Sequence, residues 1–153
     1  MPSSRAAQKA FLSALPPHIK HIYELGSGWG GIAFAAARAC PTATIHAFEL
    51  SWAPWFFSCC VRIACRYHNV RIYRKNFFSC SLREADVVVC YLYPGAMRKL
   101  SPLCEKSLKP GALILSNSFA LPGWTPQAVI PVDDFWKSEI YIYGMPAADA
   151  RQE

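Results

Sequence analysis

The feature that most constrains the fold is an alternation of short β-branched runs with longer helical segments. The strand-like runs span 21–25, 44–48, 70–73, 87–92 and 112–115, and the helix candidates between them span 30–39, 52–67 and 96–107. Parallel strands need long connections, and these are usually helices. The alternation therefore predicts an α/β fold with a mostly parallel sheet and helices on both faces.

The two ends of the chain depart from this alternation. A helix over 4–15 is expected to end at Pro16 and Pro17, because proline cannot continue a helix. Two strand-like runs at 127–132 and 139–143 are joined by a segment too short for a crossover helix, so this last pair should be antiparallel. We expect residues 1–153 to form a single domain with a frayed tail over 146–153.

Composition excludes several classes of protein. With 53% apolar and 17% charged residues, the chain should pack a core, and no apolar run reaches the roughly 18 residues of a membrane-spanning helix. The seven cysteines are odd in number and lack zinc-ligand spacing, so neither a disulfide framework nor a metal site is predicted. Arg5 and Lys9 interrupt the place of a secretory signal. We therefore expect a reducing, cytoplasmic location.

A glycine-rich loop follows the first strand and leads into an alanine-rich helix. Gly26, Gly28 and Gly31 fit the dinucleotide spacing G-x-G-x-x-G, whereas Gly26, Gly28 and Gly30 fit E-x-G-x-G-x-G, so glycines alone leave the cofactor open. Glu24 lies two residues before this loop, at the carboxyl end of the strand. A carboxylate there would repel a pyrophosphate and attract an ammonium or sulfonium group, which favours a cationic ligand.

Glu49 closes the second strand-like run, and Leu50 follows it. A carboxylate at this position can accept hydrogen bonds from both hydroxyls of a ribose. The loop and Glu49 together therefore predict a cofactor that contains adenosine.

These residues resemble class I S-adenosylmethionine-dependent methyltransferases. The resemblance is carried by YELGSGWG at 23–30, by Glu49 and by LKPG at 108–111, and it covers about residues 18–144. The run FALPGWTP at 119–126 is similar to the small lysine methyltransferases of the ATP synthase c subunit and the adenine nucleotide translocase. The resemblance implies a Rossmann-like seven-stranded sheet with an antiparallel last strand, and S-adenosylmethionine as cofactor.

The resemblance also assigns roles to individual residues. It implies that Glu24 faces the methionine amino group, that the loop passes beneath the cofactor and that Glu49 takes the ribose. The expected cofactor-binding residues are Glu24, Gly26, Ser27, Gly28, Gly30, Glu49, Leu50, Asn76, Phe77 and Tyr91.

Two positions depart from the family pattern. Asn76 stands where such enzymes usually have aspartate; its amide could pair with adenine and Phe77 could stack on the ring, with turn and core roles as the alternatives. Trp29 occupies a position that is often small or acidic. Its indole either covers the cofactor or fills the pocket, and in the second case the chain would be a non-catalytic binding module.

The acceptor site is expected after the strand-like run 87–92, at the edge of the sheet where ligands bind. Tyr91, Tyr93 and Pro94 are the candidates for its wall, with core packing as the alternative for the tyrosines, while Asp86 is interpreted as structural. A lysine acceptor must be neutral, and an aromatic pocket lowers its pKa by desolvation. A protein lysine is the preferred acceptor; RNA, a small molecule, or a nicotinamide-dependent oxidoreductase activity are the alternatives.

The region from Leu50 to Arg83 has no acidic residue, and the chain carries a net charge of +6. This stretch could attract an acidic partner or nucleic acid, or form an ordinary solvated surface. Within it, the helix candidate 52–67 has apolar rows at 55/59/63/67 and 56/60/64 that we expect to face the sheet. The third row, 57/61/65, is also apolar. Three apolar rows are more apolar surface than one face of a sheet can bury. We expect a homodimer partner or a membrane surface to cover the remainder, with packing against a neighbouring helix as the alternative.

Overall fold

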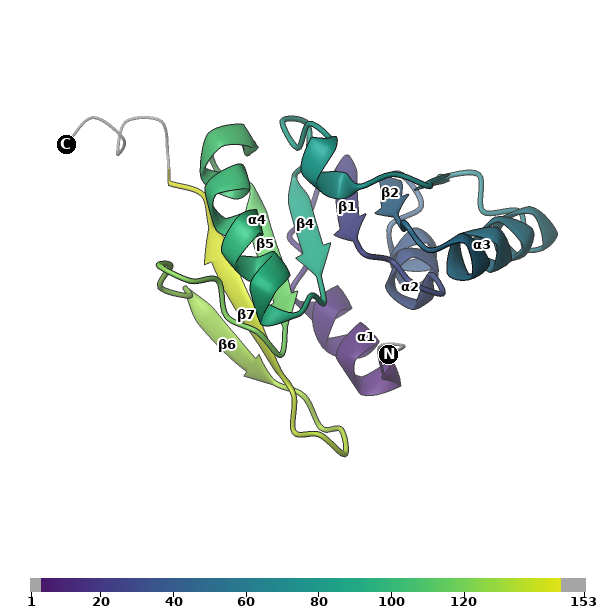
Figure 1. Cartoon of the computed structure of the whole chain (residues 1–153). Helices are drawn as coiled ribbons and strands as arrows, with labels where there is room; N and C mark the ends of the chain where they lie inside the picture. Colours follow the sequence, from purple (N-terminus) through teal and green to yellow (C-terminus); the bar gives the residue numbers. More distant parts are fainter. Residues whose placement is uncertain (1–3, 147–153) are drawn as a thin grey trace.

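The computed structural model describes residues 4–146 and contains a seven-stranded sheet with the strand order β3-β2-β1-β4-β5-β7-β6 (Figure 1). The strands are β1 (His21–Leu25), β2 (Thr44–Phe48), β3 (Val70–Tyr73), β4 (Val87–Cys90), β5 (Leu113–Asn117), β6 (Ala128–Pro131) and β7 (Glu139–Gly144). Neighbours among β1 to β5 pair in parallel, and β7 pairs antiparallel with both β5 and β6. The predicted parallel sheet with an antiparallel last strand is confirmed.

Helices cover both faces of this sheet, as expected (Figure 1). The helices are α1 (Arg5–Ser13), α2 (Gly31–Ala39), α3 (Trp52–Ala64) and α4 (Pro94–Ser107), with a short 3₁₀ helix, η1 (Phe77–Ser79). Ser4 caps α1, because its Oγ accepts a hydrogen bond of 3.1 Å from the backbone N–H of Ala7. Observed and predicted ends of helices and strands differ by at most three residues. The predicted frayed tail falls mostly on residues 147–153, which lie outside the described chain.

Alternate residues of the strands supply two separate cores, one on each face. Ile22 of β1 packs in the core that contains Phe11 of α1 and Ile32 of α2. Leu25 packs on the opposite side, in the core that contains Met97 of α4. Because Glu24 shares the parity of Ile22, its side chain lies on the face that α2 covers.

The orientation of α3 differs from the prediction. Phe56, Cys60 and Ile63 were expected to face the sheet, but all three are exposed, and the polar residue Ser58 is instead the only buried residue of α3. The physical reason is the glycine loop: the Ser58 hydroxyl donates a 3.3 Å hydrogen bond to the carbonyl oxygen of Gly28. A small residue is needed for this close approach, so α3 turns its serine inwards and its large side chains outwards.

The carboxyl ends of β1, β2, β4 and β5 meet at one edge of the sheet because these strands are parallel. The loop between β6 and β7 lies at the same edge, since Ile140 near the start of β7 pairs with Asn117 at the end of β5. The loops that follow these strands can therefore build a common site. Across residues 4–146, no helix combines the length and the apolar character needed to cross a bilayer.

Candidate active site

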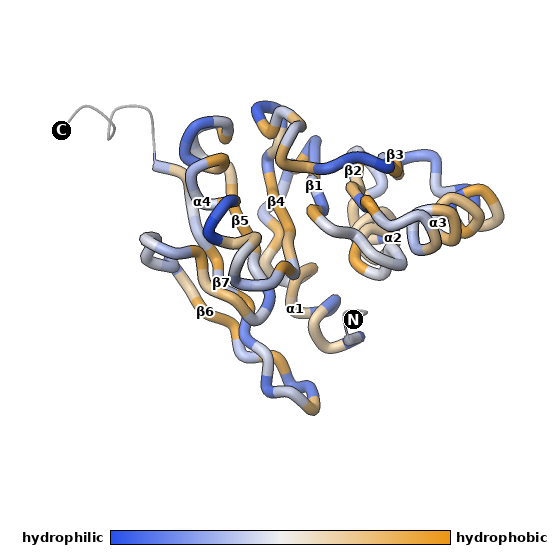
Figure 2. Tube along the Cα trace, viewed as in Figure 1, coloured by the Kyte–Doolittle hydropathy of each residue, from blue (hydrophilic) through white to orange (hydrophobic). Residues whose placement is uncertain are grey.

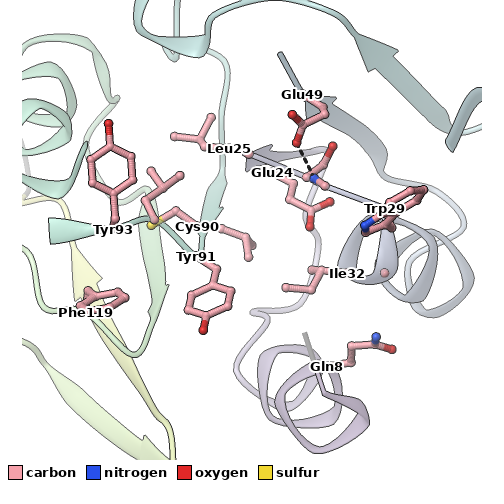
Figure 3. Close-up of a pocket in the computed structure, with 16 residues that line it drawn as sticks. Gln8, Glu24, Leu25, Trp29, Ile32, Glu49, Cys90, Tyr91, Tyr93 and Phe119 are labelled. Carbon is pink, nitrogen blue, oxygen red and sulfur yellow. Dashed lines mark hydrogen bonds between the residues drawn. The ribbon is translucent and has the colours of Figure 1, made fainter. Parts of the chain in front are cut away.

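A cavity of about 430 Å³ opens at this edge, between the carboxyl ends of β1 and β4 (Figure 3). One wall is formed by the end of β1, the glycine loop and Glu49, and the other by residues that follow β4 and β5. The lining residues are Gln8, Glu24, Leu25, Gly26, Ser27, Gly28, Trp29, Gly31, Ile32, Glu49, Val89, Cys90, Tyr91, Leu92, Tyr93 and Phe119. The cavity thus brings together Glu24 from the end of β1, Glu49 from the end of β2, and Tyr91 and Tyr93, which both follow β4.

The glycine loop turns back on itself through positive φ angles, which only glycine adopts at little cost. Gly28 has φ 53°, lines the cavity, and an added Cβ there would meet no atom within 4 Å. Gly30 has φ 80°, and its added Cβ would come within 2.6 Å of the ring of Phe34. Gly28 is therefore the open floor of the site, whereas Gly30 packs against α2 and does not line the cavity.

Glu49 ties this loop to the end of β2. Its Oε2 accepts a 2.8 Å hydrogen bond from the backbone N–H of Gly28 (Figure 3). Its Oε1 accepts one of 2.7 Å from the backbone N–H of Ser51. A carboxylate oxygen can accept more than one hydrogen bond. Glu49 is thus fixed in position and retains acceptor capacity for a ligand hydroxyl.

Glu24 is 95% buried, and its Oε2 has no hydrogen-bond partner among the described residues. Burial raises the pKa of Glu24 to about 8; the backbone N–H of Ala33 lowers this pKa, and the nearby Glu49 raises it. The Ser27 hydroxyl, also buried beside the cavity, likewise has no partner in residues 4–146. Unpartnered buried polar groups are costly, so both atoms fit a site completed by a cationic, hydrogen-bonding ligand.

A second cavity of about 330 Å³ adjoins the first and shares Gly26, Glu49, Leu92 and Tyr93 with it. Its lining includes the three remaining candidates for adenine contact, Leu50, Asn76 and Phe77. The side-chain oxygen of Asn76 accepts a 3.1 Å hydrogen bond from the backbone N–H of Phe78 and so caps η1. We therefore expect a ligand contact with Asn76 to use its amide nitrogen.

Trp29 lines the first cavity without filling it. Its ring packs edge-on against Phe57 of α3, with centroids 5.2 Å apart and the rings inclined at 76°. The side chain is half exposed. Of the two roles left open for Trp29, the structure favours a cover at the rim of the pocket over an obstruction.

The opposite wall is aromatic. Tyr91 stacks near Phe119, with centroids 6.5 Å apart and planes inclined at 19°, and Tyr93 is 69% exposed at the mouth (Figure 3). Pro94, which was predicted for the acceptor wall, lies outside the lining of both cavities. It occupies the first position of α4, where proline is favoured because its backbone lacks an N–H.

Several lining residues were not singled out by sequence reasoning, among them Phe119 and Gln8. Phe119 follows the end of β5, so the rule that ligands sit at carboxyl ends of parallel strands would have found it. Gln8 comes from α1, and nothing in the local pattern of that helix marks it. Its place depends on the packing of α1 against α2 and β7.

Comparison with known proteins decides the family. Residues 24–128 match the model of the ANTKMT methyltransferase domain. The chain belongs to this methyltransferase family. The protein-lysine N-methyltransferase of Saccharolobus islandicus (strain REY15A) is 38% identical over 132 residues, which cover 80% of this chain and 77% of that protein.

The adenine nucleotide translocase lysine N-methyltransferase of Mus musculus is 30% identical over 138 residues; the match covers 87% of this methyltransferase but 59% of the mouse protein. An RNA methyltransferase from Salinibacter ruber, solved with S-adenosyl-L-homocysteine, shares the fold with a TM-score of 0.80 at 24% identity, over 95% of this chain and 94% of that one. The predicted membership of the S-adenosylmethionine-dependent methyltransferases is confirmed. The predicted resemblance to the lysine methyltransferases of the adenine nucleotide translocase and the ATP synthase c subunit is also confirmed. The nicotinamide-dependent oxidoreductase is thereby set aside.

Proposed function

We propose that this methyltransferase transfers the methyl group of S-adenosylmethionine to the ε-amine of a lysine in a protein. The observation that carries the proposal is the buried carboxylate of Glu24, which lines an open cavity floored by Gly28 and whose Oε2 has no hydrogen-bond partner within residues 4–146. A buried acid with a pKa raised to about 8 becomes ionised most readily when a cation binds beside it.

The linings of the two adjoining cavities contain a candidate partner for each part of such a donor. Glu24 and Ser27 would hold the methionine ammonium, Glu49 the ribose hydroxyls, and Asn76 and Phe77 the adenine. When bound, the donor supplies an electrophilic methyl on a positively charged sulfur. The chain's own contribution is to fix both ends of the ligand, so that the methyl group is presented to the aromatic wall.

The aromatic wall prepares the acceptor. Tyr91, Tyr93 and Phe119 would surround the lysine side chain, remove water from its amine and lower its pKa, so that the nitrogen lone pair is available. The mouth is open enough for a side chain presented by a folded or extended protein, since Tyr93 and Trp29 at its rim are exposed or half exposed. Relatives named as lysine methyltransferases support this acceptor over RNA. A cytoplasmic location is proposed with it.

The experiment is incubation of purified protein and radiolabelled donor with extract from cells that lack the protein. Separation into protein, RNA and small-molecule fractions should place the label in protein, and peptide mass spectrometry should locate it on lysine. A Gly28→Arg variant is the matched control for labelling by other enzymes. Label confined to RNA or small molecules would overturn the acceptor, and no binding of S-adenosylhomocysteine would overturn the donor.

A further inference from the structure

The outward side of α3 is an apolar surface that no other described element covers. Every exposed residue of this helix is apolar, and Figure 2 shows hydrophobic residues along it. Four large exposed side chains and one exposed cysteine, together called the α3 stripe, are Trp52, Phe56, Phe57, Ile63 and Cys60. Exposed apolar surface of this kind on a globular protein marks an interaction site.

The aromatic residues of the stripe are preordered. Trp52 and Phe56 stack one turn apart, with centroids 5.4 Å apart and planes inclined at 5°. Phe57 contacts Trp29, so the stripe reaches the rim of the catalytic cavity. Little side-chain freedom would then be lost when this surface is covered.

Charges near the stripe identify what covers it. From Leu50 to Arg83 the chain has no acidic residue. The exposed Arg66 directly follows the C-cap of α3, and the guanidinium of the exposed Arg74 lies over the ring of Trp55 in α3, 5.9 Å from its centroid. Two copies joined through their stripes would bring these like charges together without an acidic partner in the same region, which opposes a dimer. An anionic surface would instead gain from each of them.

We propose that the α3 stripe seats this protein on the surface of anionic phospholipid membranes. A helix with Trp and Phe on one side and arginines beside it matches the pattern of interfacial helices that lie in the plane of the membrane. Because Trp29 joins the stripe to the cavity, the bound protein holds its active-site mouth beside the lipid surface. The proposal is independent of the identity of the methyl acceptor.

The chain offers a matched control. Phe135 and Trp136, in the β6–β7 loop, are 89% and 70% exposed, more than Trp52 and Phe56 at 60% and 50%. They follow Asp133 and Asp134 directly in the chain. If exposed aromatic area alone sufficed, this loop would bind membranes at least as well as α3.

The test is sedimentation with vesicles of phosphatidylcholine alone, or with about one-third phosphatidylglycerol. We expect the protein to bind only the anionic vesicles, with binding weakened by added salt. Trp52→Ser/Phe56→Ser should weaken binding at least about tenfold, because two aromatic side chains no longer enter the interface. Phe135→Ser/Trp136→Ser should leave it unchanged within about twofold.

Each variant is checked by circular dichroism and thermal unfolding, and Ile63→Ser serves as a second stripe variant if the double change impairs folding. Failure to bind anionic vesicles, or equal losses in the stripe and loop variants, would overturn the proposal. So would a dimer in sedimentation velocity that the stripe variants abolish, since a second copy would then be the occupant.

Discussion

The two walls of the candidate active-site cavity are built in different ways. The wall proposed for the donor comes mainly from one continuous unit, from Glu24 at the end of β1 through the glycine loop to Glu49 at the end of β2. The wall proposed for the acceptor combines Tyr91, Tyr93 and Phe119, which follow two different strands. The donor wall carries buried charge and backbone groups, whereas the acceptor wall is aromatic. One wall should therefore control binding of the donor, and the other the use of the acceptor.

The largest effect should come from Gly28→Arg, which fills the floor of the donor wall. We expect the affinity for S-adenosylhomocysteine, measured by calorimetry, to fall about 100-fold, because overpacking a fixed cavity costs up to about 3 kcal/mol. Gly111→Arg is the control: Gly111 also has a positive φ, 77°, and open space around its Cβ, but it lies outside both cavities. Equal affinity in the two variants would remove the loop from the donor site.

The second largest effect should come from Glu24→Gln, which we expect to lower the affinity for S-adenosylhomocysteine about 30-fold. Removal of one partner from a buried charged contact costs about 2 kcal/mol or more. The loss should appear with S-adenosylhomocysteine and vanish with methylthioadenosine, which lacks the amino acid part. A matching loss with both ligands would mean that Glu24 acts by holding the loop and does not contact the ammonium.

The same variant has a pH signature in the absence of ligand. The pKa of Glu24 is raised from 4.5 to about 8 in the folded chain, so the unfolded state binds fewer protons between these values. The free energy of unfolding must then fall as pH rises through this window. Glu24→Gln lacks this titration. The stability of the variant relative to the natural protein, measured by thermal unfolding, should therefore increase as the pH is raised from about 5 to about 9.

A change in the acceptor wall should have the opposite pattern. Tyr91→Ala/Phe119→Ala should lower kcat/KM for a lysine substrate about tenfold through lost desolvation and positioning, with affinity for S-adenosylhomocysteine unchanged within about twofold. Tyr93→Phe keeps the ring at the mouth and should retain most of the activity. If the double variant lost donor affinity instead, the division of the cavity into two walls would be wrong.

The smallest effect is expected at Asn76. Asn76→Ala removes both the cap of η1 and the proposed adenine contact, and should weaken donor binding about fivefold, equivalent to about 1 kcal/mol. Asn76→Ser keeps a capping oxygen and removes the amide donor without adding a charge. Equal affinity of the Ser variant and the natural protein, measured by the same titration, would show that Asn76 acts only as a cap.

The donor wall was largely predictable because its geometry is local. A carboxylate at a strand end, a glycine turn and a following helix place Glu24 and Gly28 at the carboxyl edge in any parallel sheet. Trp29 shows the limit of such reasoning: its sequence position allowed both a cover and an obstruction. The choice depended on Phe57, which belongs to a different helix.

The outward face of α3 shows a different kind of limit. Because three rows of this helix are apolar, the sequence allowed more than one row to face the sheet. In the structure, Ser58 donates a hydrogen bond to Gly28, and in this orientation Trp52, Phe56 and Phe57 are exposed. The chain did reveal that more apolar surface was present than one sheet face could bury. It did not reveal which residues would be exposed.

The amino-acid sequence alone set the order of strands and helices along the chain, the turn of the glycine loop and the position of the Glu24 carboxylate at the end of a strand. Neighbouring residues specify each of these features. The positions of Gln8 and Phe119 in the cavity, the packing of Trp29 and the exposed side of α3 arose only when separate elements docked. Docking is decided by volumes and hydrogen bonds between segments far apart in the chain, and no local pattern records these.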